Sequence, residues 1–233
     1  MRMEIKQIFE SNYLSRKKFS FGETFALFYL MVCVLVTLMG WNTPGMTEAL
    51  VANAKNVFQH EEVWRLFSTT FLHADIGHLL SNSLMLFILI YYNSSFFGGL
   101  FTLSSSFFFG AIINGITIYT YTEGTSLIGA SGVLYYLWGF WLVNYFMIQK
   151  QFSIMARVLR IGSIFLVLLV PTSLDPQTSY RAHYIGLIVG MVWGGMNYLW
   201  NAHKYRKFEK YKVEFIPEED DSGLPWNQSE EQY

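Results

Sequence analysis

The stretch IGHLLSNSLMLFILIYYNSSFFGGLFTLSSSFFFGAIINGITIYTYT, residues 76–122, contains no Asp, Glu, Lys or Arg, and it decides the class of fold. A helix needs about 20 predominantly apolar residues to cross a bilayer, so this stretch is long enough for two crossings. A tight turn between them is predicted at YNSSFFGG, residues 92–99, from its asparagine, serines and paired glycines. Residues 24–47 and 124–149 are also uncharged, and each is long enough for one further crossing. The sequence therefore predicts an all-α polytopic membrane protein.

The composition of the whole chain agrees with a membrane protein. Apolar residues make up 52% of the 233 residues and aromatic residues 18%, whereas only 14% are charged. Soluble domains carry about 25% charged residues. No basic patch lies outside the short flanks of the membrane segments, so no nucleic-acid partner is expected. The single cysteine, Cys33, lies inside the first apolar run, where we expect it to act as a small packing residue.

Six membrane-spanning helices fit the pattern best. They are predicted near Thr24–Trp41, Gly77–Phe97, Gly99–Tyr121, Ser131–Ile148, Arg157–Pro171 and Tyr180–Trp200. These spans define a membrane domain over residues 24–200, between an N-terminal segment (1–23) and a tail (201–233). The acidic end of the tail, from EEDDSG onward, is expected to be disordered because it is poor in residues that form a core.

The distribution of basic residues predicts the orientation. With the N-terminus in the cytoplasm, only three of the sixteen lysines and arginines (Lys55, Arg65 and Arg181) lie in outer loops, and the other thirteen lie in cytoplasmic segments. Cytoplasmic loops of membrane proteins carry an excess of Lys and Arg. Both termini are therefore expected in the cytoplasm.

The first outer loop, Asn42 to Ile76, is too long to lack structure in a compact protein. The segment TEALVANAKNVF, residues 47–58, predicts a short helix capped by Thr47. The segment VWRLFSTTFLH, residues 63–73, mixes aromatic residues with one arginine, as a segment in the membrane interface does.

Four polar residues are predicted to lie at one depth in the outer leaflet. His78 and Asn82 fall in the outer turns of the second span, Ser131 in the first turn of the fourth, and His183 in the first turn of the sixth. Each has a structural interpretation alone, because small and polar residues commonly line helix contacts in membranes, as does the GLIVG motif of residues 186–190. Polar groups in hydrocarbon are costly, so their convergence from three helices favours a functional site.

Acyl transfer is the chemistry that these groups could perform. A serine hydroxyl becomes a nucleophile when a neighbouring base takes its proton, and His183 could do this for Ser131. His78 and Asn82, spaced i and i+4, share a helix face and could bind an oxyanion together with the backbone N–H of Ser131. Tyr135 lies one helical turn after Ser131 on the same face.

No carboxylate is placed by the sequence to orient the histidine. Asp75, Glu123 and Asp175 all fall in predicted outer loops, and nothing in the sequence brings any of them to His183. A Ser/His dyad is therefore the expected arrangement.

Four motifs in the chain resemble those of the rhomboid family of intramembrane serine proteases, in its six-span bacterial type. They are WR (Trp64–Arg65), H-x4-H-x3-N (His73, His78 and Asn82), G-x-S-G (Gly129, Ser131 and Gly132, followed by Tyr135) and A-H-x2-G-x3-G (Ala182, His183, Gly186 and Gly190). G-x-S-G alone has little specificity. Four motifs in the family's order on the expected spans are highly specific.

The resemblance implies a rhomboid-like fold and a role for each matched residue. Ser131 would be the nucleophile, His183 the general base, and His78 and Asn82 would assist the Ser131 backbone in binding the oxyanion. Tyr135 would stack against His183. The implied substrates are transmembrane segments of other proteins, cut within the lipid bilayer near their outer ends, and the implied location is the bacterial plasma membrane. No cofactor and no metal are implied.

The other motif residues would be structural by the same resemblance, which is imperfect at one position. Trp64, Arg65 and His73 would support the first outer loop. The family often carries an acidic residue about twelve positions after the asparagine of the second span, where this chain has Ser94. That acidic residue supports packing at the inner end, so the difference bears on stability more than on chemistry.

Three alternatives to a protease are weighed against it. A catalytically silent rhomboid-like protein that binds or escorts membrane clients would typically lack the serine or the histidine, and this chain retains both. A metal enzyme using His73, His78 and His183 is disfavoured because the chain has no H-E-x-x-H motif. A transporter is disfavoured because no broken helices recur in matching halves of the chain.

Overall fold

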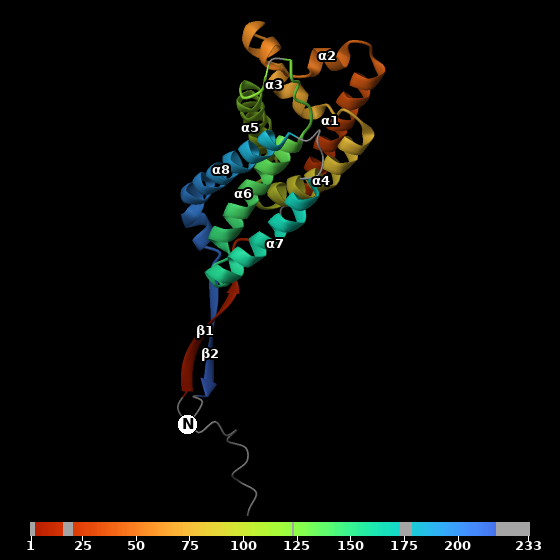
Figure 1. Ribbon diagram of the computed structural model, residues 1–233. Helices are drawn as coiled ribbons and strands as arrows, with labels where there is room; N and C mark the ends of the chain where they lie inside the picture. Colours follow the sequence, from red (N-terminus) through yellow and green to blue (C-terminus); the bar gives the residue numbers. More distant parts are fainter. Residues whose placement is uncertain (1–2, 16–20, 123, 173–178, 218–233) are drawn as a thin grey trace, which may run out of the picture.

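A computed structural model describes residues 3–15, 21–122, 124–172 and 179–217. Most of these residues belong to a bundle of long helices (Figure 1). The helices are α1 (Gly22–Asn42), α4 (Ile76–Phe97), α5 (Gly99–Tyr119), α6 (Ser131–Ile148), α7 (Ile154–Thr172) and α8 (Tyr180–Arg206). Each lies where a span was predicted, although α8 continues to Arg206 instead of ending near Trp200. Three of them, α1, α4 and α5, are long and apolar enough to cross a membrane.

The turn between α4 and α5 differs from the prediction. The residues Asn93 to Ser95 were expected to form part of it, but they continue α4, and the Asn93 amide donates to the Leu89 carbonyl of its own helix at 2.8 Å. The direction of the chain changes at Gly98, whose φ of 107° is accessible to glycine and unfavourable for other residues. A single glycine therefore separates the two helices.

Glycines allow α6 and α8 to pack with their backbones in contact. A Cβ on Gly186 would collide with the Gly132 carbonyl oxygen, and one on Gly190 would collide with that of Tyr136. From the other side, a Cβ on Gly139 would collide with the Leu187 carbonyl oxygen. The predicted packing role of the glycines in these two helices is confirmed.

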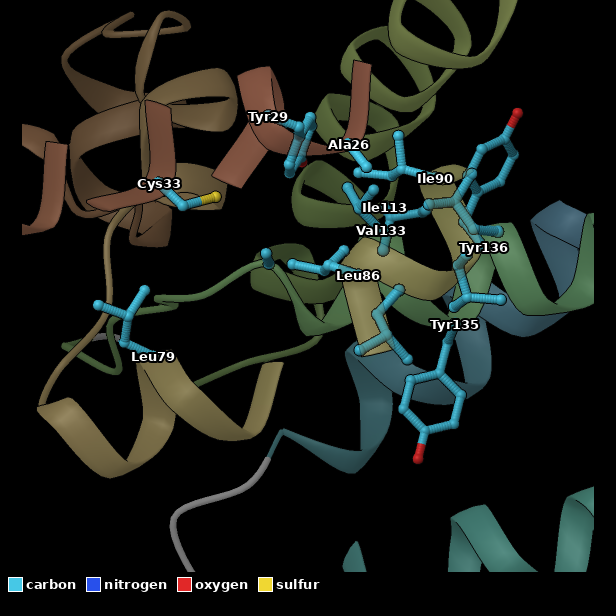
Figure 2. Close-up of a cluster of buried hydrophobic side chains, with 14 residues drawn as sticks. Ala26, Tyr29, Cys33, Leu79, Leu86, Ile90, Ile113, Val133, Tyr135 and Tyr136 are labelled. Carbon is cyan, nitrogen blue, oxygen red and sulfur yellow. The ribbon is translucent and has the colours of Figure 1, made fainter. Parts of the chain in front are cut away.

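The hydrophobic core lies where α1, α4, α5 and α6 meet (Figure 2). Its labelled side chains are Ala26, Tyr29 and Cys33 from α1, Leu79, Leu86 and Ile90 from α4, Ile113 from α5, and Val133, Tyr135 and Tyr136 from α6. Cys33 is 1% exposed, so its predicted role as a packing residue is confirmed. Large apolar side chains such as Leu27, Phe28 and Met31 of α1 are exposed, as lipid-facing residues would be.

The segment between α1 and α4 is folded into four short helices. They are α2 (Met46–Leu50), the π-helix η1 (Lys55–Gln59), α3 (Arg65–Ser68) and the 3₁₀-helix η2 (Thr69–Phe71). The predicted single helix capped by Thr47 is wrong. Thr47 lies inside α2 and its hydroxyl donates to the Gly40 carbonyl at 2.9 Å, while the extended backbone of Val51 ends the helix.

The expectation of an all-α chain is also wrong at the two ends of the molecule. β1 (Met3–Ser11) pairs antiparallel with β2 (Lys210–Pro217), and the resulting ribbon extends from one end of the bundle (Figure 1). The alternation of Tyr211, Val213 and Phe215 with charged residues has the period of a strand and was the signal for β2. The tail that was predicted to be disordered, from Glu218, lies outside the described residues.

Tyr13 anchors the N-terminal segment to the same end of the bundle. Its side chain is 1% exposed, and its hydroxyl donates to the Phe96 carbonyl at the end of α4 at 2.6 Å. Its ring lies 4.6 Å from that of Tyr205 in α8. The ribbon is thereby attached to the C-terminal ends of two helices.

Candidate active site

Ser131 is the first residue of α6. The turn before it contains Gly129, whose φ is 113°, and the first hydrogen bond of the helix runs from Leu134 N to Ala130 O at 3.0 Å. The backbone N–H groups in the first turn of a helix have no acceptor within the helix. The Ser131 N–H is therefore a donor at the positive end of the helix dipole, next to its own half-buried side chain.

His183 lies in the first turn of α8, which Ser179 caps. The Ser179 hydroxyl accepts from Ala182 N and its carbonyl accepts from His183 N, both at 3.2 Å. The His183 imidazole is buried and stacks on Tyr135 of α6, with ring centroids 4.1 Å apart and planes 17° apart. The stacking that the resemblance implied is confirmed. The imidazole Nδ1 is buried with no hydrogen-bond partner among the described residues.

The first turns of α6 and α8 face each other. A Cβ placed on Gly132 would lie 3.8 Å from both the Cβ and the carbonyl oxygen of Ala182. The residue after Ser131 thus contacts the residue before His183. Because the Tyr135–His183 stack joins the same two turns, both side chains proposed for the dyad lie at one helix crossing.

His78 and Asn82 of α4 lie on the other side of the Ser131 turn. A Cβ on Gly129 would lie 2.7 Å from Cε1 and 2.8 Å from Nε2 of His78, and 3.8 Å from Nδ2 of Asn82. The Asn82 side chain is buried, and its Nδ2 has no hydrogen-bond partner among the described residues. The structure therefore brings a buried amide donor, without a partner in the described part of the chain, against the turn that carries Ser131.

The carboxylates considered from the sequence do not approach His183 within the described residues. The Asp75 carboxylate caps α4, accepting from His78 N at 2.9 Å. Glu123 and Asp175 lie outside the described residues. Where the chain is described, the carboxylates of the three salt bridges belong to Glu62, Glu209 and Glu214, and none of their partners is a histidine.

Comparison with known proteins agrees with the four motifs. The family model described as Rhomboid domain matches residues 60–199, more than half of the chain. The chain belongs to the rhomboid family. Rhomboids are a family of intramembrane serine proteases with a polytopic membrane fold, so this rhomboid is an integral membrane protein. No curated protein matches the sequence. The matched range runs from α3 through α7 and into α8, whereas α1, α2 and the β1–β2 ribbon lie outside it.

His73 supports the segment between α1 and α4 in this rhomboid. Its carbonyl accepts from Trp41 Nε1 at 3.0 Å, and its Nδ1 lies 3.3 Å from the Thr37 hydroxyl, so it ties the loop to α1. Its ring meets that of His78 edge to face at 5.1 Å. Burial of the side chain, with a smaller contribution from His78, lowers the pKa of His73 to about 4.

Arg65 organises the beginning of the same loop. Its Nε donates to the Glu62 carboxylate at 2.6 Å, and its Nη1 donates to the carbonyls of Glu48 at 2.5 Å and Val51 at 3.1 Å. The guanidinium lies 5.5 Å from the centre of the neighbouring Trp64 ring. These contacts agree with the structural role that the resemblance implied for this motif.

Ser94 replaces the acidic residue that many rhomboids carry. It is 2% exposed, and its hydroxyl has no hydrogen-bond partner among the described residues. A carboxylate at this buried position would need a donor. A serine at this position avoids burying a charge that would need a partner.

Two residues that hold the segment between α1 and α4 in place were missed from the sequence. The Asn114 amide of α5 donates to the Leu66 carbonyl at 2.7 Å and to the Thr70 hydroxyl at 2.8 Å, which holds α3 and η2 against the bundle. The Thr69 hydroxyl donates to the Leu127 carbonyl, 58 positions later in the chain. No local pattern could have found these contacts, because each joins segments that are distant in sequence.

A metal centre has no support in the part of the chain that the structure describes. Among those residues, no group of three or more His, Cys, Asp or Glu side chains is placed to hold a metal ion.

Proposed function

We propose that this rhomboid is an active serine endopeptidase that cleaves transmembrane segments of other membrane proteins. The observation that carries the proposal is the crossing of α6 and α8, where Gly132 contacts Ala182 and Tyr135 stacks on His183. This crossing brings the turns of Ser131 and His183 together, as a nucleophile and its base require.

The proposed reaction proceeds through an acyl-enzyme. The Ser131 hydroxyl attacks the scissile carbonyl carbon as His183 accepts its proton, and the carbonyl oxygen becomes an oxyanion. The tetrahedral intermediate collapses as the protonated His183 gives its proton to the leaving amine. Water, deprotonated by His183, then attacks the ester and releases Ser131. No cofactor takes part in either half of the reaction.

The oxyanion would be bound by donors from two sides. The Ser131 N–H lies at the N-terminus of α6, and Asn82 Nδ2 and the His78 ring approach the turn from α4. Donors held in place before the reaction stabilise developing charge without reorganisation, and each is worth about 100-fold or more in rate. We therefore assign His78 and Asn82 to the oxyanion site.

We further propose the six-span topology of the bacterial type, with both termini in the cytoplasm. In addition to α1, α4 and α5, the helices α6, α7 and α8 would cross the plasma membrane, within a membrane domain of residues 24–200 and cytoplasmic segments 1–23 and 201–233. Eleven of the eighteen residues of α6 are buried, as expected of a helix in the middle of a membrane bundle. The polar first turns of α4, α6 and α8 would then lie together in the outer leaflet.

Cleavage in proteoliposomes tests the activity. Ser131→Ala and His183→Ala should each abolish cutting of a model transmembrane substrate, whereas Ser104→Ala, which removes an exposed hydroxyl on α5, should leave it intact. A fluorophosphonate should label the wild-type protein and not Ser131→Ala. Cleavage by Ser131→Ala at the wild-type rate would show that the nucleophile assignment is wrong.

The second candidate is a silent rhomboid-like protein that binds membrane clients. It is favoured only by the family relationship, since both dyad residues are present and lie at one helix crossing. Absence of both labelling and cleavage in a folded wild-type protein would support it against the protease.

A further inference from the structure

Two residues of the first outer loop hold the turn that precedes Ser131. Leu127 N donates to the Ala52 carbonyl at 2.7 Å, and Gly129 N donates to the Thr69 carbonyl at 3.0 Å. The Thr69 hydroxyl donates in turn to the Leu127 carbonyl. Thr69 is therefore the residue that bonds the turn at two points, once with its backbone and once with its side chain.

The turn depends on such contacts because its own conformation is irregular. It has no helical hydrogen bonds before Ala130, and it contains the positive φ of Gly129. An irregular segment keeps one conformation only when its surroundings determine it. The Thr69 side chain is fully buried and the Leu127 side chain is 4% exposed, so water does not readily replace the bond between them.

Small displacements of this turn would be transmitted to the reacting groups. Gly129 contacts His78 and Asn82 on one side, and Ser131 follows it by two residues. A shift of about 1 Å in a reacting group can cost about 100-fold in rate. The position of the turn therefore bears on both the nucleophile and the oxyanion donors.

We propose that Thr69 is a positioning residue for Ser131: its hydroxyl holds the Leu127 carbonyl and thereby sets the place of the nucleophile turn. This inference rests on the proposed protease function. Thr69 touches neither the dyad nor the oxyanion donors in the described contacts, so it acts through the turn and takes no part in the chemical step.

The neighbouring hydroxyls supply matched controls. The Ser68 hydroxyl donates to the Leu50 carbonyl at 2.8 Å, and the Thr70 hydroxyl accepts from Asn114. Thr70 is 4% exposed, so Thr70→Val removes a buried hydroxyl from the same short segment without touching the nucleophile turn. Thr69→Ser keeps the donor, and Thr69→Val removes it at nearly constant shape.

The kinetic test compares these variants on a model transmembrane substrate in proteoliposomes. Thr69→Val should lower kcat about 10- to 100-fold with little change in KM, because the substrate still binds while the nucleophile is displaced. Thr69→Ser should restore most of kcat, and Thr70→Val should leave kcat near the wild-type value. Equal loss in Thr69→Ser and Thr69→Val, or in Thr69→Val and Thr70→Val, would overturn the proposal, as would wild-type kcat in Thr69→Val.

A structural measurement keeps the inference separate from the proposed function. Hydrogen–deuterium exchange should be faster over residues 127–131 in Thr69→Val than in the wild type or Thr70→Val, whether or not the protein cleaves anything. Unchanged exchange there would overturn the positioning role even in an active protease. If exchange over residues 127–131 is faster in Thr69→Val than in the wild type, but the wild type neither cleaves nor reacts with a fluorophosphonate, the positioning role of Thr69 stands and the protease function is contradicted.

Discussion

The ring of Tyr135 stacks on the imidazole of His183, with centroids 4.1 Å apart and planes 17° apart. The two residues belong to α6 and α8, so the contact both joins the helices and limits rotation of the imidazole about its side-chain bonds. A base that is held in one orientation needs no reorganisation when the substrate arrives.

Replacing Tyr135 should separate the stacking from the hydroxyl. Tyr135→Leu removes the ring face and should lower kcat about 10-fold or more, because a misoriented base transfers protons poorly. Tyr135→Phe retains the ring and should retain more of the activity than Tyr135→Leu. The measurement is kcat on a model transmembrane substrate. Activity in Tyr135→Leu equal to or above that of Tyr135→Phe would contradict an orienting role for the stack.

Asn82 should matter for activity and little for stability. Its buried Nδ2 has no partner among the described residues, so Asn82→Ala loses no hydrogen bond from this atom in the resting protein. In the reaction, Asn82→Ala should lower kcat about 100-fold, because one oxyanion donor is lost. The measurements are kcat and the Tm in detergent.

Asn114→Ala is the matched control for Asn82. The Asn114 amide donates two hydrogen bonds to α3 and η2, so its removal should lower the Tm clearly. A larger loss of Tm in Asn82→Ala than in Asn114→Ala would show that Asn82 serves the fold.

Gly129→Ala should lower activity by more than the backbone strain of an alanine at positive φ explains. Both Gly129 and Gly124 have positive φ values, 113° and 91°, so alanine at either position should destabilise the fold by about 1–2 kcal/mol. Only at Gly129 would the new Cβ meet other atoms, 2.7 Å from His78 Cε1. Gly129→Ala should therefore lose activity while Gly124→Ala, at similar stability, retains it. Equal activity in the two variants, measured by cleavage rate, would argue against the His78 contact.

Gly186→Ala should destabilise the bundle. Its Cβ would collide with the Gly132 carbonyl oxygen and force α6 and α8 apart, at a cost of about 1–3 kcal/mol. Gly195 lies on the same helix with open space around its Cβ position, so Gly195→Ala should be neutral or stabilise the protein by up to about 1 kcal/mol. The free energy of unfolding in detergent is the measurement. A neutral Gly186→Ala would mean that the helices can separate without cost.

Acid should destabilise the protein through His73. Burial lowers its pKa to about 4, from 6.5 in the unfolded chain, and the groups facing it are His78 and Asp75. Above pH 6.5 the imidazole is neutral in both states and has no effect. As the pH falls toward 4, the unfolded chain binds a proton that the folded protein does not, and up to about 3 kcal/mol of stability is lost.

A variant without the imidazole tests this dependence. His73→Asn should show a shallower fall in the free energy of unfolding between pH 6.5 and 4 than the wild type, whatever its stability at neutral pH. His60→Asn, which changes an exposed side chain of the same loop, should keep the wild-type slope. Equal slopes in all three proteins would refute the assignment to His73.

Several features of the fold could be predicted from the sequence because they are local. The uncharged runs located the long helices, and the glycines of α6 and α8 indicated the close crossing that the structure contains. The order of motifs predicted the rhomboid family, which the match over residues 60–199 confirms. The assignment of Ser131 and His183 as a catalytic pair stays a prediction until activity is measured.

The ribbon and the first outer loop were missed for different reasons. β1 and β2 lie at opposite ends of the chain, and a strand pattern of eight or nine residues has no visible partner until the helices bring the ends together. In the segment between α1 and α4, Thr47 has the residue type of a helix cap, but it lies inside α2 and its hydroxyl donates to the Gly40 carbonyl of α1.

By itself the sequence located the long helices, and it predicted which residues carry the chemistry and at what depth they meet. Only the tertiary structure decided what surrounds them: the Thr69 hydroxyl bonds the Leu127 carbonyl, and the Asn82 amide lies beside Gly129 with no hydrogen-bond partner among the described residues. The physical reason is the range of the interactions. Hydrophobicity and charge act on each segment separately, whereas a hydrogen bond or a ring contact between distant segments exists only after the whole bundle has packed.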